Sequence, residues 1–553
     1  MVCGKGNGNE SIVSFILHSP APLYAAVKLS NHFRAESTKF KERSKDLVLA
    51  GDACEELAVD ILTLACANDA SKLLNAVDDN GKTFLDVLVD CEQKHCVAHT
   101  AVQSYLGSKW RAGRNWKISK VLFIFFVAFF VPPLWVGLSL PWNNNYSRVP
   151  LVKFICQLIS HLYLMLLFLF MLVIPTGKSP QDLIPAWYEV LLLFWLCGLV
   201  LTQLTDPQNS SGLGRVPLFI VCLSAVGVVV HLAAIPFDHE ETRSVIVYTR
   251  NQIFALAMFL TFVQLLDFLT FHHLFGPWGV IIGNLMQDLA RFIVILLIFV
   301  LGFTAHLAAI TRPTNNTTIA GGVKMAENVL KIFKTLCFSL FGAVEIEKLE
   351  NLAEHAPVAT LPTVLVNIAF CFYALVTIIV LINLLIAMMS DTYQRIQAQS
   401  DLEWKFGRAK LIRKLERSTR TPAPLNLFTT AVAYVRFYHK MNCKCCRPDL
   451  MEILNEEAND GLSMHHIFTS TNSVSPEATV GMYNNEHAHT TARIEQVVNW
   501  ARIVKKYKAL RGMEEVSNEK EVKQAVVENS KSVHDIKELV EGLLMKMNVT
   551  PQH

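Results

Sequence analysis

The stretch Leu330–Glu350, "LKIFKTLCFSLFGAVEIEKLE", could act on cations because a short apolar helix is followed by a glycine and a carboxylate. Gly342 allows backbone carbonyls to face an ion, and a ring of Glu345 carboxylates would attract cations. One chain supplies one such carboxylate, so a pore built this way needs four copies around an axis. The alternative is an extracellular loop with a buried amphipathic helix, since a Phe-Gly pair with a downstream glutamate is a weak motif.

A second candidate site lies in Ile382–Gly407, "INLLIAMMSDTYQRIQAQSDLEWKFG", where the pattern predicts one uninterrupted helix. One face, at spacings of four, three and four residues, carries Ile382, Ile386, Met389 and Tyr393. A ring of isoleucines on this face would form a hydrophobic constriction that closes by dewetting. The amide of Asn383 is costly in an apolar span, so it bonds a neighbouring helix, lines the pore, or does both.

The composition indicates a membrane protein with soluble ends. Of the 553 residues, 52% are hydrophobic and 18% are charged, whereas ordinary soluble chains carry roughly 25% charge. The net charge of +3 gives no indication of a nucleic-acid partner, because the basic residues are clustered locally. The 13 cysteines lack a metal-binding framework, so we interpret them as mostly reduced thiols and expect neither a metal nor a cofactor. The catalytic motifs of NTPases, zinc proteases and serine hydrolases do not occur, so no enzyme is expected.

Seven apolar runs are long enough to cross a bilayer, which takes about 20 residues. They are Ile118–Leu140, Leu151–Ile174, Ala186–Leu204, Val216–Ile235, Tyr248–Thr270, Phe292–Ile310 and Thr363–Met389. The segment after the last run, Lys405–Arg420, is strongly basic and is therefore expected in the cytosol. The N-terminus lacks a signal peptide and is expected there too, which requires an even number of crossings.

Pro132 and Pro133 identify the run that does not cross, because consecutive prolines remove helix donors and clash with the preceding turn. We interpret Ile118–Leu140 as an elbow that enters the inner leaflet and returns. The runner-up is a seven-helix receptor, in which this run crosses and the N-terminus lies outside.

Glycosylation would separate the two topologies. Six crossings place the long loop Thr311–Pro362 outside, with overlapping sequons at Asn315 and Asn316. Sugar at either position would support six crossings, whereas sugar at Asn9 would support the receptor.

Several motifs resemble the transient receptor potential (TRP) channels. "LINLLIAMMSDTY" resembles the end of their pore-lining helix, and "EWKFGRAKLIRKL" resembles their TRP helix. "FHHLFGPWGVIIGNLMQDLARF", "SDTYQRIQAQSDLEWKFG" and "TPAPLNLF" are similar to the TRPN, or no-mechanoreceptor-potential, branch. "CVAHTAVQSYLGSKW" is similar to the linker helices of TRPC and TRPN proteins. The whole resemblance extends over roughly residues 46–428.

The resemblance implies an all-α membrane fold with six transmembrane helices and a re-entrant pore loop between the fifth and sixth. It implies a homotetrameric, non-selective cation channel that conducts calcium and sodium and is gated mechanically. It also implies location in the plasma membrane, in sensory cilia or dendrites, with the cytoskeleton and anionic phosphoinositides as partners.

The resemblance also implies roles for individual residues. The selectivity filter would comprise Phe341, Gly342, Ala343 and Glu345, and the gate Ile382, Asn383, Ile386 and Met389. Gating would be coupled through Trp404, Lys405, Phe406, Gly407 and Arg408 of the TRP helix, and through Pro277 and Trp278 of the linker before the fifth span. Family members with two glycines in the filter differ from this sequence, so the roles of Gly342 and Ala343 stay open. Taken alone, Trp404 would better suit an interfacial anchor, and the family resemblance reverses that preference.

Voltage sensing is not expected from the fourth span, Tyr248–Thr270. A voltage sensor needs arginines at every third residue, because each charge contributes only about 2.3 kcal/mol per 100 mV. This span offers Arg250 and the opposite charge of Asp267.

The soluble ends contain helical spacing and one ankyrin-like phrase, "DDNGKTFLDVLVD". TRPN proteins carry a long ankyrin spring, and this sequence begins about where that spring ends, so the resemblance implies a form without it. A heptad seam from Val522 to Met547 predicts a coiled coil with Asn529 in its core, or a helix packed on the cytosolic domain.

The predicted organisation has nine parts. They are an N-terminal segment (1–45), linker helices (46–117), the elbow (118–140), a four-helix bundle (151–271), an amphipathic linker (275–288), the pore domain (289–390) with its pore loop (330–350), the TRP helix (391–420), a cytosolic, partly disordered region (421–490) and C-terminal helices (491–553).

Overall fold

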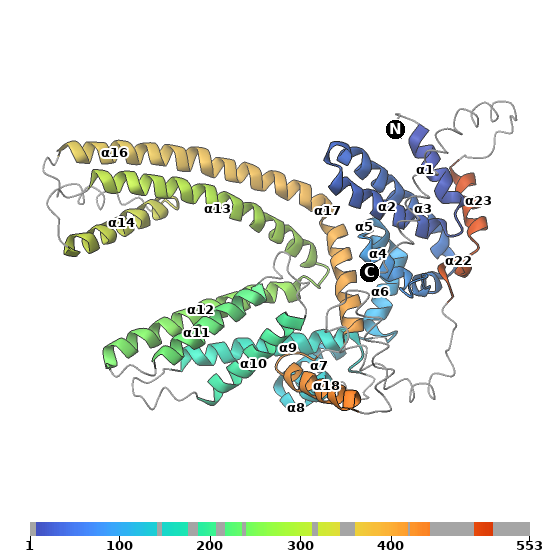
Figure 1. Ribbon diagram of the computed structural model, residues 1–553, viewed down its shortest axis with the longest axis horizontal. Coiled ribbons are helices and arrows are strands. Elements are labelled where there is room, and N and C mark those ends of the chain that lie inside the picture. Colours follow the sequence, from blue (N-terminus) through green and yellow to red (C-terminus); the bar gives the residue numbers. More distant parts are fainter. Residues whose placement is uncertain are drawn as a thin grey trace. The chain divides into compact units, whose positions relative to one another are not determined.

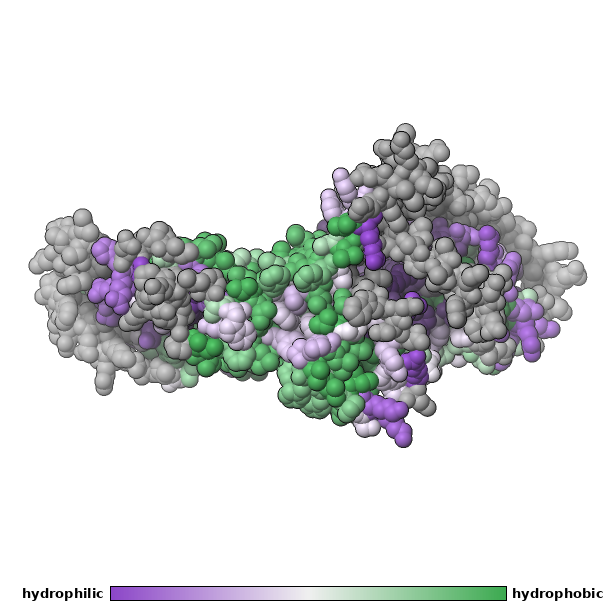
Figure 2. Space-filling view, turned by 90° about the horizontal axis from the view of Figure 1, so that it is seen from below, coloured by the Kyte–Doolittle hydropathy of each residue, from purple (hydrophilic) through white to green (hydrophobic). Residues whose placement is uncertain are grey.

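The computed structural model describes residues 7–114, 116–140, 146–174, 186–205, 216–234, 239–311, 319–342, 360–418, 421–442 and 492–511. The regular elements in these ranges are helices, and β-structure is limited to isolated bridges at Val77 (Figure 1). Among the described residues, six helices are long and apolar enough to cross a membrane. The predicted class, an all-α membrane protein with six candidate spans, is therefore confirmed. Hydrophobic residues cover much of the described surface in Figure 2, as expected for helices that face lipid.

The described residues fall into two compact units. Of the described residues, the first unit holds those up to residue 268 and those from residue 402 onward. The second unit holds residues 269–401.

The first unit begins with short helices around a long one. They are α1 (Asn7–His18), α2 (Pro22–Lys39), the turn η1 (Lys41–Arg43), α3 (Ser44–Asn75), α4 (Phe84–Asp90), α5 (Lys94–Ala98) and α6 (Thr100–Arg111). The helix α3 packs along α2 through the fully buried Leu23, Ile61 and Leu62. The ankyrin-like phrase forms a tight turn at Gly81, whose φ of 71° suits glycine, and then becomes α4.

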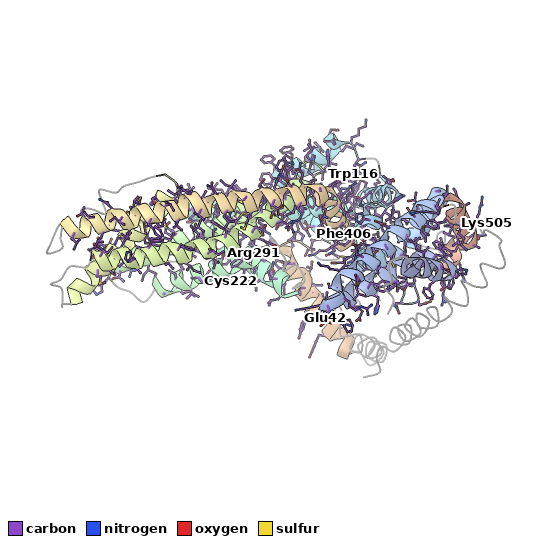
Figure 3. The ribbon with its side chains drawn as sticks, turned by 90° about the horizontal axis from the view of Figure 1, so that it is seen from above. Glu42, Trp116, Cys222, Arg291, Phe406 and Lys505 are labelled. Carbon is purple, nitrogen blue, oxygen red and sulfur yellow. The ribbon has the colours of Figure 1, made fainter. Side chains whose placement is uncertain are left out.

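Two C-terminal helices return to this N-terminal group. They are α22 (Ile494–Val497) and α23 (Trp500–Leu510). Trp500 and Tyr507 are buried, and Arg511 pairs with Asp60 of α3 at 2.7 Å, whereas Lys505 lies on the exposed side of α23 (Figure 3). The predicted heptad seam, 522–547, lies outside the described residues.

The proline pair divides the first apolar run into two helices. The helix α7 (Ile118–Phe130) ends at Val131, and α8 (Pro132–Ser139) leaves at an angle of 114°. Proline suits the first turn of α8, where its missing N–H has no helical partner anyway. Trp135 donates its indole N–H to the carbonyl of Cys156, and Tyr163 donates its hydroxyl to the carbonyl of Phe129, so both arms are attached to the next helix.

Four apolar helices form the bundle that follows. They are α9 (Pro150–Val173), α10 (Trp187–Thr205), α11 (Val216–Ala234) and α12 (Glu240–Leu269). Their shared core includes Phe168, Leu192, Ile220 and Phe254. The ring of Phe254 on α12 lies close to Gly227 on α11, and a Cβ added to Gly227 would lie 3.0 Å from that ring. The lack of a side chain at Gly227 therefore allows the close spacing of α11 and α12.

A polar cluster lies inside this bundle around Arg250. Its guanidinium is fully buried and donates to the Nδ1 of His231 at 2.7 Å and to Glu189 at 3.4 Å. Arginine has no acceptor, so this Nδ1 must be unprotonated. The cluster holds α10, α11 and α12 together through the guanidinium of Arg250.

The second unit contains α13 (Gly276–Ile310), α14 (Ile319–Ser339), α16 (Thr360–Ala374), a π-helical segment η4 (Leu375–Leu381) and the first part of α17 (Ile382–Arg417). The predicted linker (275–288) and fifth span (292–310) are one continuous helix here. No proline or glycine lies between residues 284 and 301 to break it. The predicted uninterrupted helix from Ile382 through Gly407 is confirmed by α17, and after it α18 spans Leu425–Asn442.

Candidate pore and gating helix

The helix α14 packs in the groove between α13 and α16. Ile332 and Leu336 are buried against Val300 and Leu307, and the hydroxyl of Tyr373 donates to the carbonyl of Leu336 at 2.8 Å. The helix begins at Ile319, earlier than the predicted start at residue 330. It is therefore held firmly by both flanking helices.

A turn follows α14 where the filter is predicted. Gly342 has a φ of 86°, a conformation that side-chain-bearing residues rarely adopt, so this glycine fits a chain reversal. Phe341 is 87% exposed. Ala343 and Glu345 lie outside the described residues, as do Asn315 and Asn316. The structure therefore describes the first half of the predicted filter only.

The predicted gate residues lie on α17 as the periodicity indicates. Ile386 is 60% exposed in the single chain, and Ile382 and Met389 are half-buried. Asn383 is exposed, and its amide donates to the carbonyl of Ile379 at 2.6 Å. That carbonyl belongs to the π-helical segment, so the amide bonds its own helix. The stripe is available for contact with other copies of the chain.

One contact joins the linker half of α13 to the gate helix, and the sequence analysis missed it. The buried Thr392 donates its hydroxyl to Oδ2 of Asp288 at 2.7 Å, and Arg291 pairs with Oδ1 of Asp288 at 3.1 Å. Both residues stand in quoted motifs, but nothing in their spacing indicates that they meet. Thr392 lies directly beside Tyr393 on the gate stripe.

The start of α13 brings the predicted linker residues together in a tight corner. Pro277 occupies the first turn of the helix, and Trp278 is exposed. A Cβ added to Gly279 would lie 2.4 Å from Cγ2 of Thr270, so the corner requires glycine there. The packing of Trp404 against this corner stays a prediction.

The second half of α17, within the first unit, is attached to the N-terminal helices by ion pairs. Arg413 contacts Asp90 at 2.5 Å and Asp86 at 3.9 Å, and Arg417 contacts Asp86. Further pairs join Lys94 to Glu403 at 2.5 Å, Lys109 to Glu416 at 2.6 Å and Lys410 to Glu92 at 3.6 Å. We call this set the clamp.

Asp86 has a double role in the clamp. The backbone N–H of Asp86 donates to the hydroxyl oxygen of Thr83, the N-cap of α4. The Thr83 hydroxyl in turn donates to the carboxylate of Asp86 at 2.5 Å. Its side chain is nearly buried, so the two arginines of α17 neutralise a charge that would otherwise be costly. The same carboxylate thus caps one helix and holds another.

The TRP-helix residues predicted to couple gating take different positions. Phe406 is buried, with the ammonium of Lys410 4.6 Å from its ring centre (Figure 3). The guanidinium of Arg408 lies 5.8 Å from the ring centre of Trp404. The carbonyl of Lys405 accepts from Gln103 of α6 at 3.5 Å, and Gly407 is exposed. The apolar face of this helix is therefore buried within the first unit.

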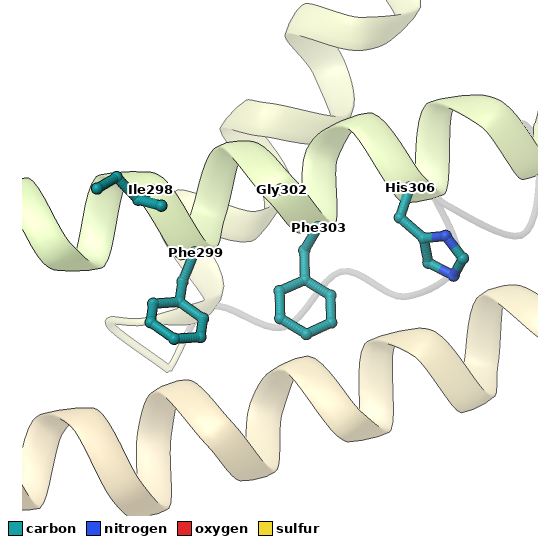
Figure 4. Close-up of a pocket in the computed structure, with 5 residues that line it drawn as sticks. All are labelled: Ile298, Phe299, Gly302, Phe303 and His306. Atoms are coloured by element: carbon teal, nitrogen blue, oxygen red, sulfur yellow. The ribbon is translucent and has the colours of Figure 1, made fainter.

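A surface groove lies on α13 in the second unit. It measures about 310 Å³ and is lined by Ile298, Phe299, Gly302, Phe303 and His306, all on α13 (Figure 4). The ring of Phe303 contacts Tyr373 of α16 edge-on at 5.3 Å. None of the predicted filter or gate residues lines it.

The sequence is similar to known ion channels. The family model described as "Calcium channel YVC1-like, C-terminal" matches residues 162–453, slightly more than half of the chain. The chain belongs to the TRP channel family. Membership confirms the expectation that the chain is an ion-channel relative and no enzyme, and it does not favour a seven-helix receptor.

The curated relatives are short transient receptor potential channels. Channel 2 of Rattus norvegicus is 24% identical over 511 residues, which cover 80% of this chain and 42% of the relative. Channel 3 of the same species is 23% identical over 560 residues (85% and 59%), and channel 4 of Homo sapiens is 24% identical over 485 residues (79% and 48%). The chain spans about half the length of the curated TRP relatives it matches.

The contact between Asp288 and Thr392 in this TRP-family chain yields a prediction. Replacing Thr392 with valine keeps the shape but leaves Asp288 without the hydroxyl, and a hydrogen bond to a charged group contributes about 1.5–3 kcal/mol. We expect the purified Thr392→Val variant to have a lower melting temperature than the native chain. Thr392→Ser keeps the hydroxyl and should retain most of the native stability. Equal melting temperatures for the valine variant and the native chain would show that the contact contributes nothing.

The clamp yields a prediction about pH. Burial raises the pKa of Asp90, but hydrogen bonds and charges from Arg413 and Lys82 outweigh it, so the pKa lies below its usual value. The stabilisation by Asp90 is therefore present above the unfolded pKa of about 3.9 and is lost as pH falls through the lower folded pKa. Because the pair is partly exposed, we expect only about 0.2–1 kcal/mol.

The measurement compares melting temperatures of the native chain and Asp90→Asn across pH. We expect a constant difference from about pH 5 to pH 9 that disappears under acid conditions. A difference that instead changed near neutral pH would contradict the assignment. Lys109 behaves in the opposite sense. Burial lowers its pKa, but the hydrogen bond and charge of Glu416 outweigh burial, so the pKa lies above its usual value and the stabilisation by Lys109 is lost only at strongly basic pH.

Proposed function

We propose that four copies of this chain form a non-selective cation channel in the plasma membrane, opened by movement of α17. The observation that supports this most directly is the continuity of that helix. It begins with the exposed stripe around Ile386 and ends with the arginines of the clamp, Arg413 and Arg417. In this proposal, a displacement of the N-terminal helices would move the gate residues because both are attached to the same continuous helix.

The cation path in this proposal follows the axis of the tetramer. Glu345 would form a carboxylate ring beside Gly342 at the outer mouth and concentrate calcium and sodium ions. Ile386 would form the constriction at the inner end, with Ile382 one turn away. Both termini would lie in the cytosol, the elbow α7–α8 in the inner leaflet, and Asn315 and Asn316 outside.

We further propose mechanical gating of the TRPN type. The support is the resemblance of the linker, gate-helix and TRP-helix motifs to that branch, together with the hydrogen bond of α17 to the linker and its ion pairs with the N-terminal helices. Asp288 of the linker bonds Thr392, and in the proposal Trp404 also packs against the corner at Pro277 and Trp278. Basic residues of the TRP helix, such as Lys405, would bind anionic phosphoinositides. Sensory cilia or dendrites and a cytoskeletal partner belong to the same proposal.

The deciding experiment records currents from the purified chain in planar bilayers under controlled stretch. Cation currents that rise with tension support the proposal, and a protein that inserts but passes no current would overturn it. Currents indifferent to tension would remove mechanical gating alone. Glu345→Gln should reduce divalent block or permeation, with Glu327→Gln on α14 as the control, and unchanged selectivity would remove Glu345 from the filter.

A further inference from the structure

The helix α6 begins at a histidine. His99 is the N-cap of α6, and its Nδ1 accepts a hydrogen bond from the backbone N–H of Ala101 at 3.3 Å. A side chain at this position satisfies a backbone N–H that has no partner within the helix. Val102 stands where a capping box would need glutamate or glutamine. The start of α6 therefore depends on the imidazole of His99.

A contact with α3 determines the tautomer of this imidazole. The Nε2 of His99 lies 3.2 Å from the hydroxyl oxygen of Thr63. The hydroxyl proton of Thr63 is donated to the carbonyl of Val59 at 2.8 Å, so the hydroxyl oxygen accepts from Nε2–H. The single proton of the neutral ring is thus on Nε2, and the lone pair of Nδ1 is available for Ala101. The two hydrogen bonds together require a neutral ring.

A second proton on the ring would remove the cap. Imidazolium carries a proton on both nitrogens, so Nδ1–H would face the N–H of Ala101 instead of accepting from it. The added charge would also lie at the N-terminus of α6, where the helix dipole is positive and disfavours cations. Protonation of His99 therefore breaks one hydrogen bond and places a repelled charge beside the first turn of α6.

The ionisable groups on the helices around the ring are engaged elsewhere, neutral or exposed. They are Asp60 and Cys66 of α3 and Lys94, His95 and Cys96 of α5. Asp60 pairs with Arg511, and Lys94 pairs with Glu403. Burial raises the pKa of the two thiols, so both are neutral at acid pH. The side chain of His95 is exposed.

The environment of His99 gives the pH range in which the cap is lost. Burial lowers the pKa of His99 below the usual value of about 6.5, because the charged form is disfavoured out of water. The unfolded chain binds the proton more readily than the folded chain. The stabilisation by the neutral cap is therefore fully present above about pH 6.5 and is lost as pH falls through the lower folded pKa.

The start of α6 is connected to the gate helix. The backbone N–H of Gln103 donates to the carbonyl of His99 at 3.0 Å, and its side-chain amide donates to the carbonyl of Lys405 on α17 at 3.5 Å. Farther along α6, Lys109 pairs with Glu416 of α17 in the clamp. Loss of order in the first turn of α6 would therefore displace Gln103, which contacts α17.

We propose that His99 is a pH-sensitive switch, in which a proton on Nδ1 releases the first turn of α6 and loosens its contact with α17. The switch itself depends only on contacts within the first unit. Its effect on gating rests on the proposed function: acid on the cytosolic side weakens the attachment between the N-terminal helices and the gate helix. Currents evoked by stretch then become smaller.

The test is hydrogen exchange of the full chain in phosphatidylcholine vesicles, read by mass spectrometry for the peptide that contains α6. Protection factors, which are corrected for the intrinsic pH dependence of exchange, are compared at about pH 7.5 and about pH 5, on either side of the range given above. We expect the native chain to lose protection at the start of α6 by about fivefold at the lower pH, as for the loss of one N-cap.

Two variants of His99 bracket the native behaviour. His99→Asn keeps a good N-cap that does not titrate, so its protection should be high at both pH values. His99→Ala has no cap, so its protection should be low at both. The native chain should match the asparagine variant near pH 7.5 and approach the alanine variant near pH 5.

The matched control is His95→Asn, which removes a neighbouring imidazole that takes no part in the cap. This variant should keep the full response to pH. Unchanged protection of the native chain at the lower pH would overturn the switch. An acid-induced loss in His99→Asn equal to that of the native chain would overturn it as well.

A second measurement tests the effect on gating. Currents evoked by stretch are recorded with acid on the cytosolic side of the bilayer. The current of the native chain should fall, whereas that of His99→Asn should persist, and an equal fall in both would overturn the link to gating. A chain that passes no current at either pH would count against the proposed channel, and the exchange measurement would still decide the switch.

Discussion

Replacing Ile386 with asparagine is expected to make the closed channel leak. The proposed constriction excludes water because four isoleucine side chains present only apolar surface, and an amide at each position would let water enter. Burying one isoleucine contributes about 1.5–3 kcal/mol. Losing even one such contribution therefore lowers the equilibrium constant between the closed and open states by about tenfold or more. The measurement is the resting current of the chain in bilayers without applied tension.

Two control variants make the result specific to the gate stripe. Ile386→Leu conserves volume and apolarity and should stay closed. Leu384→Asn places the same amide on the other side of α17, at a similarly exposed position, and should leak far less. If the Ile386 and Leu384 variants behave alike, the constriction is not at Ile386.

Removing Glu189 is expected to have the largest effect on folding. The guanidinium of Arg250 is fully buried among α10, α11 and α12, and breaking a buried ion pair by deleting one partner costs about 3–5 kcal/mol. We therefore expect Glu189→Ala to lower the melting temperature strongly and to reduce the yield of monodisperse protein. The Nδ1 of His231 also accepts a hydrogen bond from Arg250, but a neutral imidazole cannot replace the negative charge of Glu189.

The double variant Glu189→Leu with Arg250→Met provides the test of mechanism. Replacing both charges by apolar residues of similar size is often neutral, so the double variant should recover most of the stability lost in Glu189→Ala. A double variant as unstable as the single one would mean that the cluster has another structural role than charge compensation.

The positions of the helices were largely predictable from local pattern. The six candidate spans lie where runs of about 20 apolar residues predict them, because a single helix must satisfy its own backbone in lipid. The bend after Phe130 follows from the adjacent prolines, and the unbroken α17 follows from the absence of proline between Ile382 and Arg417. These are properties of neighbouring residues.

Two details of the gate region were only partly accessible from the sequence. The face shared by Ile382, Ile386 and Met389 follows from helical spacing, but the bond from Asn383 to the π-helical carbonyl of Ile379 does not. A π-helical segment depends on how η4 packs between neighbouring helices, and periodicity carries no such signal. The filter beyond Gly342 lies outside the described residues and stays a prediction.

The sequence by itself determined the class of the protein, its apolar helices and the stripe proposed as a gate, since burial and helical period are encoded in residues a few positions apart. Only the tertiary structure decided the partners. Asp86 meets Arg413 across 327 positions of sequence, Asp288 meets Thr392 across 104, and Ser160 meets Ala423 across 263. Charges and hydroxyls of these kinds occur throughout the chain, and which of them come within hydrogen-bonding distance depends on how distant helices pack.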